Sequence, residues 1–215
     1  VIAGRIANRL NLGGTNCTVD AACASSLSAM KMAISDLLEY RSDMMIAGGV
    51  DADNSPLMYM CFSKTPAFTK GDNPRPFDEN SGGVMIGEGM GMVVLKRLED
   101  AERDGDSIYA VIKGIGTSSD GKFKSIYAPR SGGQAKALRK AYADADIDRL
   151  SIGLLEAHGT GTAAGDAAEF DGLKEVFTED TPAKSGYPDF QHIALGSIKS
   201  QIGHTKAAAG IAGLI

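Results

Sequence analysis

The fold is decided by the stretch Thr18-Val-Asp-Ala-Ala-Cys23-Ala-Ser-Ser-Leu-Ser-Ala-Met30, in which a short β-branched run leads into a cysteine. Directly after the cysteine, apolar residues recur at helical spacing with polar residues between them, at Leu27, Met30, Ile34, Leu37 and Leu38. We predict a buried strand over residues 16–20 and a helix from about Cys23 to Tyr40. Cys23 is thereby placed at a strand-to-helix corner.

A cysteine in that position is a candidate nucleophile. The unpaired backbone N–H groups and the positive end of the helix macrodipole lower the pKa of a thiol and favour the thiolate. The alternative interpretation is a small buried hydrophobe, which is the commoner fate of a cysteine. From this motif alone the structural interpretation of Cys23 is favoured, and the motifs further along the chain reverse that order.

Length, charge and cysteine content exclude several classes of protein. The chain has 215 residues, enough to bury a core, and its net charge of −5 argues against a nucleic-acid binder, which needs clustered Lys and Arg. No run of about 18 apolar residues exists, so we expect no membrane span. Cys17, Cys23 and Cys61 lack metal-type spacing, which predicts neither zinc nor a disulfide framework and favours a reducing compartment, with the cytoplasm as the default.

The two ends of the chain are unusual for a complete protein. It begins at Val1 without Met or a signal-like segment, and it stops at Ile215 inside a helical-looking run of Ala, Gly and Ile. No helix terminator follows that run. We therefore expect an internal piece of a longer polypeptide.

The rest of the chain alternates between short apolar runs and amphipathic stretches. The apolar run over residues 43–51 predicts a parallel strand covered on both faces, which completes a βαβ unit with the Cys23 helix. Further strands are expected over residues 84–96, 109–117, 151–157 and 192–197, and helices over residues 56–68, 97–104, 132–145 and 165–177. Long loops are expected over residues 69–83 and 181–188. The alternation indicates a layered α/β fold.

Two further motifs follow predicted strands. They are Glu156-Ala-His158-Gly-Thr-Gly-Thr-Ala-Ala-Gly-Asp166 and Gly196-Ser-Ile-Lys199-Ser-Gln-Ile-Gly-His204-Thr205, and each places a histidine beside glycines where α/β folds carry their active sites. Taken alone, each motif is weak evidence for a catalytic site, because a loop histidine is usually a hydrogen-bonded structural residue and a lysine is usually solvated. Together with a helix-terminal cysteine, two imidazoles are the arrangement that acyl transfer requires. The third histidine, His192, has no second signal beside it and is assigned to structure.

These motifs, in this order, resemble the β-ketoacyl synthases (ketosynthases) of fatty acid and polyketide synthesis. The resemblance rests on Asp20-Ala-Ala-Cys23, on the His158 motif and on Lys199-Ser-Gln-Ile-Gly-His204, and it spans the whole chain. The stretches over residues 62–69 and 116–129 look most like the ketosynthase domain of the polyketide-type enzymes that make polyunsaturated fatty acids. What the resemblance implies is a thiolase-like layered α/β fold (αβαβα), present only as an internal fragment. Residues 1–215 would be a partial ketosynthase domain that lacks the family's N-terminal part and its C-terminal glycine-rich loop.

The resemblance also implies a decarboxylating Claisen condensation. Cys23 would take an acyl group from the phosphopantetheine of an acyl carrier protein, and His158 and His204 would support decarboxylation of a malonyl thioester and stabilise the enolate. Lys199 would be an electrostatic support, and Thr160 and Thr162 would contact the pantetheine arm. No bound cofactor or metal is implied, and the family forms homodimers.

The chain departs from the family pattern at a few positions. Ala21 and Ala24 stand where Thr and Ser are common beside the cysteine, although the polyunsaturated type tolerates alanine there. Gly213 stands where stand-alone fatty acid enzymes usually carry Glu, which points to the multidomain polyketide type.

Three other interpretations compete with this one. A noncatalytic ketosynthase-like subunit that sets chain length typically lacks the nucleophile, so the presence of Cys23 favours an enzyme. The stretch Gly159-Thr-Gly-Thr-Ala-Ala-Gly165 is close to a dinucleotide-binding fingerprint of an oxidoreductase, but its glycine spacing is off and the next predicted strand ends without the acidic residue that holds a ribose. Thiolases share the fold and use a cysteine, but their other motifs do not match.

Overall fold

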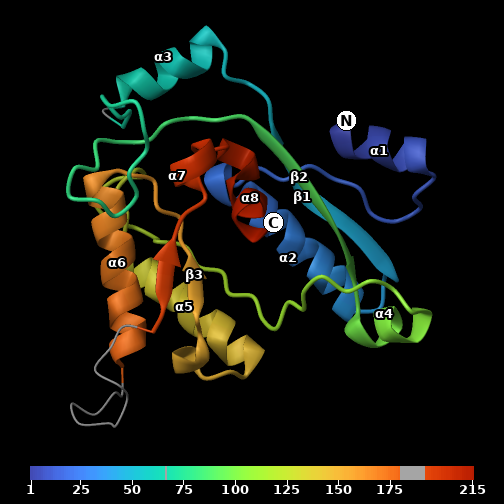
Figure 1. The fold of residues 1–215 in the computed structure, drawn as a ribbon. Helices are drawn as coiled ribbons and strands as arrows, with labels where there is room; N and C mark the ends of the chain where they lie inside the picture. Colours follow the sequence, from blue (N-terminus) through green and yellow to red (C-terminus); the bar gives the residue numbers. More distant parts are fainter. Residues whose placement is uncertain (66, 180–191) are drawn as a thin grey trace. The chain divides into compact units, whose positions relative to one another are not determined.

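The computed structural model describes residues 1–65, 67–179 and 192–215, and Figure 1 traces them from the N-terminus to the C-terminus. These residues divide into two compact units. The first consists of Val1–Met58, Ile86–Val111 and His204–Ile215, and the second of Tyr59–Met85 and Ile112–Gly203. We describe each unit by itself.

The first unit is built on a two-stranded antiparallel sheet. In this sheet Met44 of β1 lies opposite Lys96 of β2, and Asp51 lies opposite Gly89. The elements of the unit are α1 (Ile2–Leu10), η1 (Ala22–Ala24), α2 (Ser25–Leu38), β1 (Met44–Asp51), β2 (Gly89–Lys96), α4 (Leu98–Asp104), η3 (Lys206–Ala208) and α8 (Ala209–Leu214). Helices α2 and α8 and the η3 turn pack on the strands, so segments from both ends of the sequence share one core.

Small side chains let the layers of this core approach closely. The buried cluster consists of Met30, Ala33, Ala47, Ala208 and Ile211. Ala208 and Ala209, near the C-terminus, are 1% and 3% exposed. Ala21 and Ala22 are exposed on the turn that precedes α2 and do not belong to this cluster.

Gly49 of β1 marks a close approach between β1 and its neighbours, and it supports a stability prediction. A Cβ atom added there would lie 2.8 Å from the Ala207 carbonyl oxygen and 2.8 Å from the Ser26 Cβ. Because neither atom belongs to the end of a flexible side chain, we expect Gly49→Ala to lower the free energy of unfolding by about 2 kcal/mol. Gly13→Ala is the matched control, since nothing lies within 4 Å of an added Cβ at that position. Equal urea midpoints for the two variants would contradict this packing.

The first unit corrects three predictions about the N-terminal half. The Cys23 helix is confirmed, but the α-helix proper begins at Ser25, and Cys23 lies in the preceding η1 turn. Residues 16–20 form no strand and have no ladder partner among the described residues, so the expected βαβ unit is wrong. The strand over residues 43–51 does form as β1, but its partner β2 is antiparallel, because an apolar run records burial and not the direction of the neighbouring strand.

The second unit contains a packed pair of helices and a pair of short parallel strands. Its elements are α3 (Pro56–Lys64), whose first turn belongs to the first unit, then α5 (Ser131–Ala145), η2 (Arg149–Ser151), β3 (Leu154–Glu156), α6 (Ala163–Thr178), β4 (Ala194–Gly196) and α7 (Lys199–Ile202). Leu154 of β3 lies opposite Ala194 of β4, and α5 packs against α6. The edge of the Tyr142 ring meets the Phe177 ring in this helix pair, with 5.9 Å between their centroids.

The helices predicted for the remaining chain are confirmed as α3, α4, α5 and α6, and the strands expected over residues 151–157 and 192–197 form as the shorter β3 and β4. Residues 69–83 contain no helix and no strand, as expected for a long loop. The expected strand over residues 109–117 is wrong, because this segment is irregular, and the strand predicted over residues 84–96 begins only at Gly89. The loop expected over residues 181–188 lies outside the described residues.

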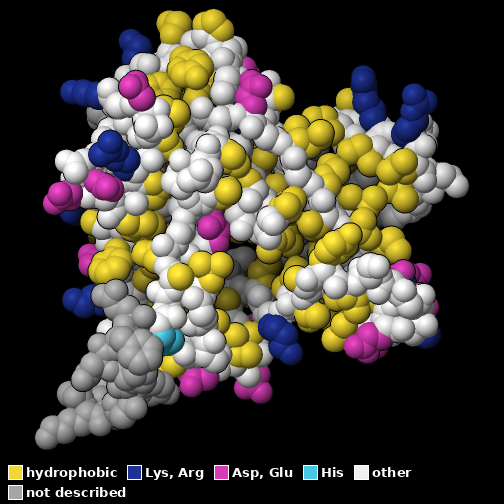
Figure 2. Space-filling view, viewed as in Figure 1, with side chains coloured by type: hydrophobic (Ala, Val, Ile, Leu, Met, Phe, Trp, Pro, Cys, Tyr) yellow, Lys and Arg dark blue, Asp and Glu magenta, His cyan; other side chains and the backbone are white. Residues whose placement is uncertain are grey.

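The surface mixes charged and apolar side chains. In Figure 2, Lys and Arg as well as Asp and Glu side chains are scattered over the described part of the visible face, and hydrophobic side chains reach the surface in many places. On β2 the exposed apolar residues alternate with inward-facing ones, as in a strand with one buried face, and they are Met90, Met92 and Val94. In the described part of the chain, no helix combines the length and apolar character needed to cross a membrane.

Candidate active site

Cys23 lies at the centre of the η1 turn, and the turn is held by its neighbours. The Ala22 N–H donates to Asp20 Oδ1 over 3.0 Å, and Ser25 Oγ accepts from the Ala21 N–H over 2.9 Å while donating to the Ala22 carbonyl over 2.7 Å. Ala22 has φ +50°, in the left-handed region that non-glycine residues rarely adopt. Such strain is typical of functional turns, and here it presents an exposed Cys23 thiol just before the N-terminus of α2.

His204 is held from two sides in the first unit and is 6% exposed. Its carbonyl accepts from the Gly87 N–H over 3.0 Å, and its Nδ1 accepts from the backbone N–H of Lys206 over 2.9 Å. Since Nδ1 is an acceptor in this hydrogen bond, the neutral imidazole carries its proton on Nε2. His204 is therefore prepared to donate a hydrogen bond from Nε2.

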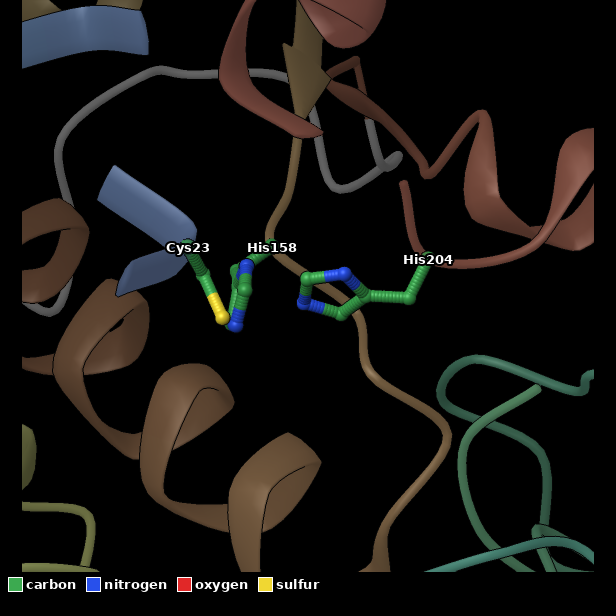
Figure 3. A group of neighbouring side chains, drawn as sticks. All are labelled: Cys23, His158 and His204. Carbon is green, nitrogen blue, oxygen red and sulfur yellow. The ribbon is translucent and has the colours of Figure 1, made fainter. Parts of the chain in front are cut away.

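The cysteine and this histidine belong to the same unit and lie close together. Cys23 Sγ lies within 4.8 Å of a ring nitrogen of His204. Figure 3 draws both side chains, and also that of His158, on the segments that carry them. Thiolate and imidazole are also zinc ligand types, but structural zinc sites use four protein ligands and catalytic ones three, whereas this pair supplies two. We therefore interpret this pair as a nucleophile beside a hydrogen-bond donor.

His158 belongs to the second unit and follows β3 directly. Its backbone N–H donates to Glu169 Oε1 over 2.6 Å, and the Gly159 N–H donates to Glu169 Oε2 over 2.8 Å. Gly159 has φ +43°, and a Cβ there would lie 2.7 Å from the Ser197 Cβ, so this position requires glycine. The glycine-rich loop is thus held in one conformation by a carboxylate of α6.

The surroundings of His158 favour the neutral imidazole. Desolvation by the surrounding protein, followed by the positive charge of Lys199, lowers the pKa of His158 from 6.5 to about 4. Lys199 is the first residue of α7 and is 5% exposed, so its charge is poorly screened by water. A neutral imidazole at this position can donate a hydrogen bond and still accept one.

The two threonines of the His158 motif have structural contacts of their own. Thr162 is the N-cap of α6, where its Oγ1 accepts from the Gly165 N–H over 3.2 Å. The hydroxyl oxygens of Thr160 and Thr162 lie 2.9 Å apart and share a hydrogen bond. Capping alone explains a threonine at position 162, and a contact with pantetheine stays a prediction for both residues.

His192 contacts the protein backbone, in keeping with its assignment to structure. Its Nε2 lies 3.0 Å from the Leu150 carbonyl oxygen, which can only accept.

Two acidic residues that hold the His158 loop were not predicted from the sequence. Asp166 receives the Gly161 N–H on Oδ1 over 3.1 Å and the Phe77 N–H on Oδ2 over 2.7 Å, and Glu169 binds the loop as described above. Burial raises the pKa of Glu169, and its two backbone hydrogen bonds oppose that rise. Their signal in the sequence is the spacing of three residues in the first turns of the helix, which puts both carboxylates on one face.

Comparison with known proteins agrees with these features. Residues 1–101 match the family described as "Beta-ketoacyl synthase, N-terminal domain", and residues 109–215 match "Beta-ketoacyl synthase, C-terminal domain". A thiolase-like layered α/β scaffold that carries a cysteine at a helix N-terminus and histidines after strands is that of a condensing enzyme. The chain belongs to the β-ketoacyl synthase family.

Individual relatives narrow the resemblance. The chain is 52% identical over 215 residues to a polyunsaturated fatty acid synthase polypeptide of Thraustochytrium sp., of which it covers 8%. Among solved structures it is similar to the ketosynthase from module 6 of the bacillaene synthase of Bacillus subtilis, with a TM-score of 0.92 and 42% identity over 99% of this chain and 37% of that one. A PfaC ketosynthase–chain length factor gives a TM-score of 0.89 and 41% identity, over 99% of this chain and 22% of that one. The chain thus spans a minor part of each of these relatives.

Proposed function

We propose that this chain carries the catalytic side chains of a ketosynthase that elongates an acyl chain by decarboxylating condensation with a malonyl thioester, in the synthesis of polyunsaturated fatty acids. The observation that carries the proposal is the pair in the first unit, an exposed Cys23 thiol within 4.8 Å of a ring nitrogen of His204, whose Nδ1 is already occupied. The 52% identity to a polyunsaturated fatty acid synthase supports the substrate class.

In the first half-reaction, Cys23 accepts the acyl group. The Cys23 thiol loses its proton, the thiolate attacks the thioester carbonyl, and the carbon–sulfur bond to the carrier breaks. The carrier leaves as a thiolate and takes up the proton that Cys23 released. The N–H groups at the start of α2 favour the anionic sulfur. An acyl-cysteine thioester results, and no cofactor is needed to form it.

In the second half-reaction, the malonyl thioester loses CO₂ and its electron pair becomes an enolate. His204 donates from Nε2 to the enolate oxygen, and we propose that neutral His158 donates to the same oxygen. Such donors stabilise charge as it develops, by about 3–4 kcal/mol each. The enolate carbon then attacks the acyl-Cys23 carbonyl, the Cys23 thiolate leaves, and the product is a 3-oxoacyl thioester that is two carbons longer.

The remaining predicted site residues take supporting roles in this proposal. Desolvation is the larger cause of the lowered pKa of His158, and the buried charge of Lys199 adds to it and helps to keep the imidazole neutral. Thr160 and Thr162 would contact the pantetheine arm, although their hydrogen bonds in the structure are to the protein itself.

We further propose the setting of the reaction. The substrates are carried on the phosphopantetheine of an acyl carrier protein, the complete domain is a homodimer, and it works in the reducing cytoplasm, where exposed thiols such as Cys17 and Cys61 persist. Residues 1–215 form part of that domain, in keeping with the 37% of a solved ketosynthase that they cover. Sedimentation of the complete domain as a monomer at micromolar concentration would contradict the dimer.

The decisive experiment supplies both substrates to the purified full-length protein. With acyl-carrier and malonyl-carrier thioesters, we expect one CO₂ released for each 3-oxoacyl product detected by mass spectrometry. With the acyl-carrier alone, only acylated Cys23 should appear. Absence of both acylation and condensation would instead favour a noncatalytic role in chain length, and binding of NAD in a titration would favour the dinucleotide-binding alternative.

The pKa of His158 leads to a prediction about acid conditions. Because the imidazole protonates only as the pH falls towards about 4, malonyl decarboxylation should persist well below pH 6.5. Lys199→Met removes one of the two causes of the lowered pKa of His158, and leaves desolvation as the other. The pKa of His158 should therefore rise, and the acid limb of the decarboxylation profile should move to higher pH. The exposed Lys136→Met variant is the control, and a profile that is the same for both variants would show that Lys199 does not act on His158.

The same pKa change makes folding depend on pH. In the unfolded chain His158 protonates near pH 6.5, whereas in the folded chain it protonates near 4, so the unfolded state binds more protons between these values. The contribution of this histidine to stability is thus present above pH 6.5 and is lost as the pH falls through that window.

A further inference from the structure

We infer that Lys206 is a positioning residue for His204, because its buried ammonium group fixes the turn whose backbone N–H orients the imidazole. The inference rests on the proposed function for what the imidazole does, and on the geometry of the first unit for how it is held. All of the residues involved lie in that unit.

The ammonium group of Lys206 is fully engaged. Its Nζ lies 2.7 Å from Asn54 Oδ1, 2.9 Å from the Gly87 carbonyl oxygen and 2.9 Å from Asp51 Oδ1. A lysine ammonium has three N–H donors, and three acceptors surround this one. Lys206 is 7% exposed, and a charge this buried is tolerated only when it is paired and hydrogen-bonded.

The backbone of Lys206 is also unusual. It has φ +51°, in the left-handed region, and it begins the η3 turn. In this conformation its N–H points at His204 Nδ1 over 2.9 Å. A strained conformation of this kind persists only where the surroundings determine it, and the three contacts of the ammonium group supply that constraint.

The contacts close into a ring of hydrogen bonds. The Gly87 N–H donates to the His204 carbonyl over 3.0 Å, the Gly87 carbonyl accepts from Lys206 Nζ, and the Lys206 N–H donates to the His204 imidazole. The ion pair with Asp51 ties this ring to the end of β1. Without the ammonium group the turn can relax, and Nδ1 loses the donor that fixes the proton on Nε2.

A merely structural lysine would behave differently. If Lys206 only stabilised the fold, its loss would lower every activity in proportion to the folded fraction. A positioning role affects the step that needs His204 and spares the step that needs only the Cys23 thiolate. The two half-reactions therefore separate the interpretations.

The test uses the full-length protein with Lys206→Met, and with Lys31→Met as the matched control on an exposed position of α2. We expect malonyl decarboxylation by Lys206→Met to fall by about tenfold or more while the rate of Cys23 acylation stays within about twofold of wild type. Asp51→Asn removes the charge partner but keeps an acceptor, so its decarboxylation rate should lie between those of wild type and Lys206→Met. Equal losses in both half-reactions would overturn the inference.

A second measurement does not depend on activity. Diethyl pyrocarbonate modifies an imidazole through a nitrogen lone pair, and in wild type the only lone pair of neutral His204 accepts a buried N–H. Modification of His204, followed by peptide mass spectrometry, should be slow in wild type and faster in Lys206→Met, with His192 as the internal reference. An unchanged rate would overturn the positioning role.

The two readouts separate the possible failures. A wild-type protein that neither loads nor decarboxylates would remove the proposed function, and the labelling of His204 would still decide the role of Lys206. If Lys206→Met does not fold, Asn54→Ala removes one of the three acceptors and leaves the charge pair in place. Asn54→Ala should then accelerate His204 labelling relative to wild type, and the absence of any acceleration would count against the inference.

Discussion

Cys23→Ala is expected to abolish acyl loading while leaving malonyl decarboxylation in place. Loading forms a bond to sulfur, so it cannot proceed without the thiolate. Decarboxylation needs hydrogen-bond donors at the thioester oxygen and does not formally need sulfur. Radiolabelled acyl groups should no longer transfer from the carrier to the variant protein, while CO₂ release from the malonyl thioester continues.

The chain contains a matched control for this experiment. Cys61 is also an exposed thiol, but it lies in the second half of α3 and not at the N-terminus of that helix. Cys61→Ala should load acyl groups at the wild-type rate. Acylation of the Cys23→Ala protein would show that the nucleophile has been misidentified.

His204→Ala is expected to produce the reverse pattern. The acyl group should still load onto Cys23, but malonyl decarboxylation should fall by about 100-fold or more, the loss that follows removal of one oxyanion donor. The physical reason is the fixed tautomer, because Nδ1 accepts from Lys206 and only Nε2 carries a proton to donate. Single-turnover measurements of each half-reaction provide the test.

His158→Ala should resemble His204→Ala if both imidazoles donate to the same developing charge. His192→Ala is the control, because that imidazole is hydrogen-bonded to the Leu150 carbonyl. A His158 variant that decarboxylates at the wild-type rate would restrict the donor role to His204. Opposite results for the two histidines would mean that the two motifs do not serve one substrate.

Local patterns in the sequence predicted the elements that carry the site, and missed the contacts that hold it. Cys23 could be placed before a helix because apolar spacing and strand-to-helix order are local signals. The antiparallel pairing of β1 with β2 could not be predicted, because partner direction depends on residues far away in the sequence. The segment over residues 16–20 has the pattern of a strand but forms no ladder, which is decided by neighbours and not by its own side chains.

The site residues were named from motifs, and their supports were not. His204 was recognised beside Lys199, but the turn that orients it depends on Asp51 and Asn54, far away in the sequence. Likewise, Glu169 lies eleven residues from His158 and holds the loop through two backbone amides. Glu169 leaves only a weak signal in the sequence, its spacing of three residues from Asp166. Asp51 and Asn54 leave none, because their contacts with Lys206 appear only when the chain has folded.

The positive φ of Ala22, directly before Cys23, has a consequence for which residues this position can hold. A glycine at position 22 would adopt φ +50° with less steric penalty, but it would also widen the range of conformations open to the turn. Alanine narrows that range, so once its neighbours hold the turn, the sulfur has few directions in which to point. Ala22→Gly is therefore expected to relieve the backbone strain of the turn and to let the Cys23 sulfur take up more directions.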